Sequence, residues 1–326
     1  MVSPRVVSLL PAATEALCAM GGERLLVGRS HECDVPRSIG HIPVLTAPRI
    51  RADADAAAID RAVRESINAG QSLYTLDEPA LRALRPDLIL TQNLCSVCAI
   101  DADHLRKIAA ELRGADGGPV RTVSLAPYTV EDVLDSVLVV AEAVGLSSRA
   151  VPVVVGLRER LFAAAEYVNP FESLGNVLFL EWTDPAFCAG HWTVQLIERA
   201  GGTHALNPTV ARPGHGTAAG PQQGERVAGP SRVISREEII ASEPARIIFC
   251  PCGFDLERAV VTAQEFLSQR WTRGLPAARA GRIAVVDGNL HFNRPGPRLA
   301  DAFEWLVGWL NDRPNLIPPG FEWKPL

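Results

Sequence analysis

The sequence lacks the features that mark a membrane-spanning or nucleic-acid-binding protein. No apolar run approaches the roughly 18 residues that a membrane-spanning helix needs. A basic excess is also missing, because the net charge is −5 at pH 7, whereas a nucleic-acid-binding surface is expected to be positively charged. We therefore predict no membrane insertion and no nucleic-acid partner.

A secretory leader is not evident at the amino terminus either. The first apolar run, VVSLL, leads directly into a turn, whereas a signal peptide combines a basic start, a longer apolar core and a small-residue cleavage site. The cysteines number seven, which does not suit a fully paired disulfide framework. These features predict a cytoplasmic protein whose thiols stay reduced, including the pair Cys95 and Cys98.

Common signatures of nucleotide and metal sites are missing as well. The chain has neither the GxxxxGK[ST] nor the GxGxxG phosphate-binding pattern, and HECD at residues 31–34 is not the HExxH of zinc proteases. CSVC at residues 95–98 matches half of a zinc site, but no second CxxC or HxxxH follows at zinc-finger spacing. No single motif therefore assigns an activity.

Strands and helices alternate along two parts of the chain, which predicts an α/β protein with parallel sheets covered on both faces. The 326 residues, 47% of them hydrophobic, are enough for two domains. Strands are expected at RVVSLL, LLVGRS, IPVLT, DLILTQ, VRTVSL, NVLFLEW, ARIIFCPCG and GRIAVVDG.

The alternation is interrupted where one helix, capped by Thr129, is followed by another, capped by Ser148, with no strand between them. We take this as the domain junction. The predicted limits are an amino-terminal lobe at 1–145, a connecting helix at 146–169 and a carboxy-terminal lobe at 170–326. The stretch 211–231 is rich in Gly, Pro and polar residues and is predicted to be a flexible loop.

Chemically distinctive side chains gather in the segments that follow the predicted strands. In parallel sheets, ligands bind at the carboxyl ends of the strands. These segments are HECD, TQNLCSVC, EWTDPAFCAGHW, CPCGF and DGNLHFNRPGPR. They hold six of the seven cysteines, the histidines His31, His191 and His291, and the aromatic residues Trp182, Phe187, Trp192, Phe254 and Phe292. Aromatic side chains supply apolar contact in ligand sites, and a few polar groups fix orientation.

The cysteines also allow other interpretations. Any one of them could be core packing, because Cys is among the most often buried residue types. A zinc or iron–sulfur site is a second hypothesis, since thiolates suit both. Its ligands would be Cys33, Cys95, Cys98, Cys188, His191, Cys250 and Cys252. A third hypothesis is a cysteine-dependent enzyme, because a helix expected from about Asp101 would stabilise a thiolate at the preceding CSVC.

Several stretches, in this order, resemble the substrate-binding proteins of cobalamin and iron-siderophore ABC importers, and most closely their cobalamin-binding branch. SLLPAATE near the start and FNRPGPRL near the end carry the resemblance most specifically. VGRSHECDVP, LRALRPDLILTQ, DPAFCAGHWTVQLIERAGG and PARIIFCPCGF also match, so the resemblance covers nearly the whole chain. It implies two Rossmann-like α/β lobes joined by one long helix, with a ligand cleft between the lobes, and a binding role without catalysis.

The resemblance further implies a small-molecule ligand, a corrinoid such as cobalamin or a related metal-containing cofactor. The residues that it points to are His31, Glu32, Cys33, Asp34, Leu94, Ser96, Val97, Phe187, Trp192, Gly253, Phe254, His291, Phe292 and Arg294. An imidazole of His31, His191 or His291, or a cysteine thiolate, would then ligate the metal. A cytoplasmic member would store, hand over or sense the cofactor, and the missing leader argues against an ABC permease as partner.

Overall fold

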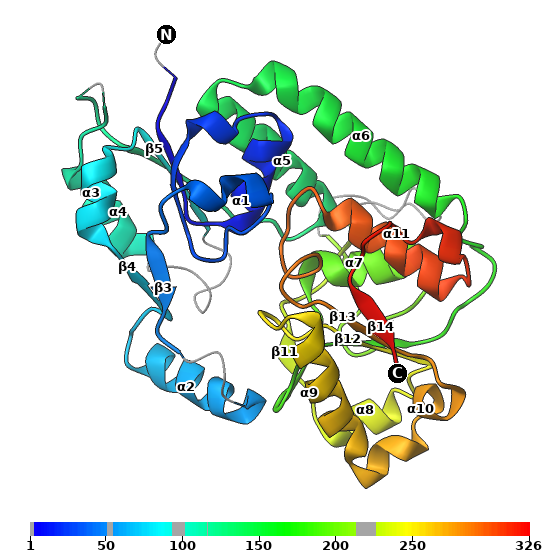
Figure 1. The fold of residues 1–326 in the computed structure, drawn as a ribbon. Helices are drawn as coiled ribbons and strands as arrows, with labels where there is room; N and C mark the ends of the chain where they lie inside the picture. Colours follow the sequence, from blue (N-terminus) through cyan, green and yellow to red (C-terminus); the bar gives the residue numbers. More distant parts are fainter. Residues whose placement is uncertain (1–2, 51–54, 93–101, 116, 213–225) are drawn as a thin grey trace. The chain divides into compact units, whose positions relative to one another are not determined.

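The computed structural model describes residues 3–50, 55–92, 102–115, 117–212 and 226–326 (Figure 1). The chain divides into two units. Unit 1 comprises Met1–Pro127 and Glu131–Leu157, and unit 2 comprises Tyr128–Val130 and Arg158–Leu326. Helix α6 (Ser147–Ala165) contributes to both units, because the division falls within it. The domain limits expected from the sequence, at 145 and 169, stay predictions.

Unit 1 is built on a four-stranded sheet with the order β2-β1-β5-β6, and all its strands are parallel. The strands are β1 (Val6–Ser8), β2 (Leu26–Arg29), β5 (Leu88–Gln92) and β6 (Arg121–Leu125). Its helices are α1 (Pro11–Ala19), α3 (Glu78–Leu84), α4 (Ala102–Glu111), α5 (Val130–Val144) and the first part of α6. The apolar residues of β1 and β5 are fully buried, as expected for central parallel strands. This sheet confirms the predicted α/β class.

A hairpin with an inserted helix lies beside this sheet and was not fully predicted. Strands β3 (Thr46–Pro48) and β4 (Tyr74–Leu76) pair antiparallel, with Thr46 opposite Leu76. Between them runs α2 (Ala56–Asn68), whose first turn is capped by the Asp55 carboxylate. The sequence indicated a short strand near β3 but neither α2 nor β4. The hairpin matters because it carries Thr46 and Tyr74 to the site described below.

Unit 2 is built on a six-stranded sheet with the order β11-β8-β7-β12-β13-β14. The strands are β7 (Val177–Thr183), β8 (Ala186–Cys188), β11 (Arg232–Val233), β12 (Arg246–Phe249), β13 (Ile283–Val286) and β14 (Trp323–Pro325). Strands β7, β12 and β13 are parallel, whereas β8 and β14 each run antiparallel to their neighbours. The sheet is therefore mixed, because the β7–β8 hairpin and β14 each add an antiparallel strand. The sequence did not indicate either of these two strands.

The helices of unit 2 are α7 (His191–Arg199), α8 (Arg236–Ala241), α9 (Leu256–Ser268), α10 (Pro276–Ala280) and α11 (Leu299–Leu310). Helix α11 buries Trp305, whose ring stacks on Phe321 with centroids 5.3 Å apart. The second part of α6 is tied to α11 by Arg160, which donates to Glu304 and Asp301. In the described ranges, no helix is long and apolar enough to cross a membrane.

The predicted flexible stretch at 211–231 is ordered at both ends. Strands β9 (Val210–Ala211) and β10 (Arg226–Val227) pair antiparallel. Residues 213–225, which form the middle of the stretch, lie outside the described part of the chain. The prediction of flexibility therefore stays untested for that middle segment.

Candidate functional site

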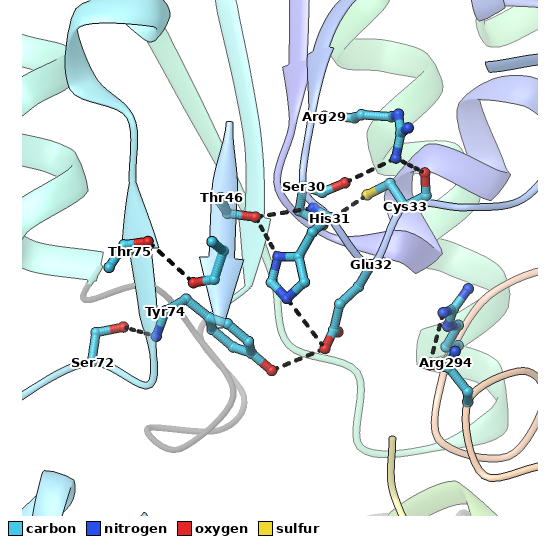
Figure 2. A network of polar contacts seen from close by, with 12 residues as sticks. Arg29, Ser30, His31, Glu32, Cys33, Thr46, Ser72, Tyr74, Thr75 and Arg294 are labelled. Carbon is cyan, nitrogen blue, oxygen red and sulfur yellow. Dashed lines mark hydrogen bonds and ion pairs between the residues drawn. The ribbon is translucent and has the colours of Figure 1, made fainter. Parts of the chain in front are cut away.

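The loop after β2 in unit 1 presents His31 and Glu32 at the carboxyl end of the sheet (Figure 2). Arg29 holds this loop from the last position of β2. Its guanidinium donates to the carbonyl of Cys33 at 2.9 Å and to that of Ile42 at 3.2 Å. The sequence predicted ligand contacts at this position, directly after a strand. The Arg29 guanidinium holds the loop at the end of β2.

His31 is fixed by Thr46 of the neighbouring hairpin. Its backbone N–H donates to Thr46 Oγ1 at 3.0 Å, and its Nδ1 lies 2.7 Å from the same oxygen. The Thr46 hydroxyl can either donate to Nδ1 or accept from it, according to which ring nitrogen carries the proton. Burial lowers the pKa of His31, against the opposing effect of Glu32. The imidazole is therefore neutral at pH 7.

Glu32 links His31 to Tyr74 on β4. The Tyr74 hydroxyl donates to Glu32 Oε1 at 3.1 Å, and His31 Nε2 lies 3.9 Å from that oxygen. The rings of His31 and Tyr74 lie 5.1 Å apart between centroids. Figure 2 shows the imidazole, carboxylate and phenol converging from the loop and the hairpin. The sequence missed Thr46 and Tyr74, since only the β3–β4 pairing brings them to His31.

Cys33 lies beneath the loop rather than on its surface. It is 1% exposed, and its Sγ lies 3.0 Å from Thr14 Oγ1 and 3.2 Å from Ser30 Oγ. Thr14 also donates to Ser8, and both come from the SLLPAATE stretch at the end of β1 and the start of α1. This buried set of hydroxyls anchors the loop through Cys33. The predicted ligand contact by Cys33 has no support from this placement, whereas Asp34 beside it is exposed.

In unit 2, most of the predicted aromatic contacts are part of the core. Trp192, Phe254 and Phe292 are buried, and the Trp192 indole donates to the Phe292 carbonyl at 2.8 Å. Trp182 and Phe187 are half-buried and stand opposite each other in the β7–β8 hairpin. An apolar ligand would therefore meet Trp182 and Phe187 rather than the three buried rings.

His191 begins helix α7 with a backbone φ of +50°, a left-handed conformation that is uncommon for a residue with a side chain. Its ring lies between Tyr128, at 5.2 Å, and Trp192, at 5.7 Å. Burial lowers the pKa of His191, so the imidazole is neutral at pH 7. No described residue forms a hydrogen bond or ion pair with this ring. A nitrogen lone pair is thus open to a ligand.

His291 and Arg294 are placed differently from the prediction, because both are buried. His291 is 5% exposed and stacks on Phe321 at 4.2 Å between centroids. Burial, together with Arg298 and Arg294, lowers the pKa of His291 to about 3. Arg294 donates to Asn289 at 3.0 Å within the same loop. The loop buries these side chains because it turns inward between β13 and α11.

The metal-site hypothesis gains no support from the described residues. No group of three or more His, Cys, Asp or Glu side chains in these ranges could hold a metal ion. Burial raises the pKa of Cys188 and of Cys250, so both thiols stay protonated, while Cys252 is exposed beside Gly253. The remaining predicted residues, Leu94, Cys95, Ser96, Val97 and Cys98, lie outside the described part of the chain.

This burial pattern predicts the order of thiol modification. Among the five cysteines that the structure describes, we expect Cys252 to be alkylated first in the native protein, because it is exposed, and Cys33, Cys188 and Cys250 to react only after unfolding. Cys18 is expected to react slowly, since burial beside Glu23 and Glu15 raises its pKa to about 12. Timed alkylation followed by peptide mass spectrometry measures each site. Modification of native Cys250 as fast as Cys252 would contradict the placement.

Comparison with known proteins was made at the level of sequence and of structure. No family model and no curated protein sequence matches the chain. Solved structures do match over nearly its whole length. The periplasmic heme-binding protein RhuT from Roseiflexus sp. RS-1 is 22% identical, with a TM-score of 0.66 over 96% of this chain and 99% of that one. The fold is that of a periplasmic solute-binding protein.

Two further structures show the range of ligands carried on this solute-binding fold. The periplasmic vitamin B12 binding protein BtuF of Vibrio cholerae is 17% identical, with a TM-score of 0.62 over 96% of this chain and 98% of that one. A periplasmic heme-binding protein from Pseudomonas aeruginosa is 20% identical, with a TM-score of 0.63 over 100% and 95%. The predicted fold of the cobalamin and siderophore importers' binding proteins is thereby confirmed.

The prediction of a cytoplasmic location is wrong. It rested on the interpretation of the amino-terminal residues as a first strand, whereas the similar structures are those of periplasmic proteins. The argument from a reducing compartment for Cys95 and Cys98 no longer stands, because it depended on that location.

Proposed function

We propose that the protein is a non-enzymatic carrier of a metal-containing tetrapyrrole, specifically a corrinoid, and that it serves an ABC importer. Loops at the carboxyl ends of strands supply the contacts. Two considerations support this ligand: the similar structures include carriers of vitamin B12 and heme, and the two most specific sequence stretches resemble the cobalamin-binding branch. Service to an importer reverses the earlier expectation against a permease partner.

The observation that carries the proposal is the imidazole of His191, which forms no hydrogen bond or ion pair with the residues that the structure describes. A neutral histidine with an open nitrogen is the commonest protein ligand for a transition metal. Its left-handed backbone conformation is a strained one that surrounding structure must maintain. The preceding Gly190 allows the backbone at Ser231 to approach closely, because a Cβ there would lie 2.3 Å from the Ser231 nitrogen. The half-buried rings of Trp182 and Phe187 in the same unit offer apolar contact to a macrocycle.

The proposal predicts that the substitution His191→Ala weakens corrinoid binding at least about tenfold, or 1.4 kcal/mol, because the axial bond to cobalt is lost. Titration of the full chain with aquocobinamide, followed by calorimetry and by the visible absorption of cobalt, measures both affinity and ligation. The imidazole-dependent spectral shift should disappear in this variant. His41→Ala is the matched control, since His41 is exposed and contacts only the nearby Ser38 carbonyl among the described residues.

Failure of the wild-type chain to bind aquocobinamide, cobalamin or hemin would refute the carrier function. Binding of a corrinoid with an unchanged spectrum and affinity in the His191→Ala variant would leave the carrier function but remove His191 from the metal.

A further inference from the structure

We infer that Glu32 selects among tetrapyrroles by charge, favouring a ligand whose rim carries amides and disfavouring one whose rim carries carboxylates. The inference rests on the proposed carrier function and adds to it a residue that determines specificity.

The two oxygens of the Glu32 carboxylate have different surroundings. Oε1 accepts the hydrogen bond of the Tyr74 hydroxyl at 3.1 Å and faces His31 Nε2 at 3.9 Å. Oε2 contacts none of the residues that the structure describes, and the side chain is 41% exposed. Figure 2 shows the carboxylate held by the phenol at the edge of this network. One oxygen therefore fixes the orientation of the group, and the other is available to a ligand.

The negative charge of Glu32 is not neutralised by the groups that hold it. Tyr74 donates a neutral hydroxyl, and the imidazole of His31 is neutral at pH 7. The nearby guanidinium of Arg29 is directed at the backbone carbonyls of Cys33 and Ile42. A ligand group that reaches Oε2 thus meets a fixed carboxylate that no cation among the described residues neutralises. Its position is partly desolvated, and charge interactions there are stronger than in bulk water.

The two classes of tetrapyrrole differ at their rims. A corrinoid carries carboxamide side chains, whose N–H groups donate to a carboxylate in a charge-assisted hydrogen bond. Heme carries two propionates, which a carboxylate repels. A repulsive group is a common way to discriminate between ligands of similar shape. Glu32 therefore favours the corrinoid and opposes heme with a single side chain.

The test is the ratio of two affinities in the full chain. Dicyanocobinamide, which has amides but no nucleotide phosphate, and hemin are titrated separately by calorimetry. We expect Glu32→Gln to strengthen hemin binding and weaken cobinamide binding, and so to change the ratio at least about tenfold, equivalent to 1.4 kcal/mol. The matched control is Glu142→Gln, because Glu142 is exposed on α5 of the same unit and contacts none of the described residues through its side chain.

Two further measurements separate charge from shape. Glu32→Asp retains the charge and should keep the preference against hemin. Hemin with amidated propionates should bind the wild-type chain better than hemin does. An unchanged ratio in Glu32→Gln, or a wild-type chain that binds hemin as well as its diamide, would overturn the role of Glu32 while leaving the carrier function intact. A wild-type chain that binds none of these probes would overturn the carrier function itself.

Discussion

Lowering the pH from 7 to 4 is expected to reduce the free energy of unfolding by about 3 kcal/mol for each of two buried histidines. His204 is 1% exposed, and neither ring nitrogen has a partner among the described residues. Burial, with a smaller effect from Arg232, lowers its pKa to about 4. The pKa of His291 is lowered to about 3. The nearby Asp301 does not reverse this shift, because its carboxylate is bound by Arg160.

The direction follows from proton uptake. An unfolded histidine binds a proton near pH 6.5, whereas the folded ones bind theirs only near pH 4 and pH 3. Between these values the unfolded chain holds more protons, so stability is full above pH 6.5 and falls as the pH falls.

Denaturant unfolding at several pH values, for the wild type and for His204→Gln and His291→Gln, measures the effect. Each substitution should remove about 1.4 kcal/mol per pH unit from the slope between pH 6 and 4.5. The exposed His41→Gln should leave the slope unchanged. Identical slopes in all four proteins would show that the two histidines are protonated in the folded state.

Gly288→Ala is expected to destabilise the protein by about 3 kcal/mol or more, near the upper end for single substitutions. A Cβ at Gly288 would lie 1.8 Å from the carbonyl oxygen of Pro251 and 2.6 Å from its carbon. Both atoms belong to the backbone, so no side chain can move aside. Two hydrogen bonds hold the backbone at Gly288 against the loop after β12. Gly288 N–H donates to the Phe254 carbonyl at 2.8 Å, and Gly253 N–H donates to the Gly288 carbonyl at 3.2 Å.

Thermal and denaturant unfolding measure this loss. Gly156→Ala is the control, since Gly156 lies within α6 with open space around its Cα, and there alanine should be neutral or stabilise by up to about 1 kcal/mol. A Gly288→Ala protein as stable as the wild type would mean that the loops after β12 and β13 lie farther apart than described.

The main elements of the fold could be predicted from the sequence because their signals are local. LIL at 88–90 and IIF at 247–249 are short apolar runs, and both are fully buried in strands that pair in parallel with both neighbours. Helix α2 was missed although Asp55 caps it and Ile59, Val63 and Ile67 recur at helical spacing. Strand β8 and the edge strand β14 were missed, since each has only three residues, too short a pattern to recognise.

The candidate site was predictable only in part. The loop at His31 follows a strand, and this position alone indicated it. Tyr74 is 43 positions further along the chain, and only the pairing of β3 with β4 places its hydroxyl on Glu32. The aromatic residues Trp192, Phe254 and Phe292 lie in segments next to strands, but composition does not reveal whether a loop side chain points into the core. The structure shows that these three do.

The division of the chain at Leu157 has a consequence for synthesis on the ribosome. Every segment of unit 1 has been made once residue 157 emerges, so this unit can fold while translation continues. Unit 2 cannot, because Arg160 finds its partners only in α11, more than 140 residues later. Strand β13 likewise receives its second neighbour only with Trp323–Pro325. The second half of α6 therefore stays without its carboxylate partners throughout most of elongation, and during that time nascent unit 2 is the part exposed to chaperones and proteases.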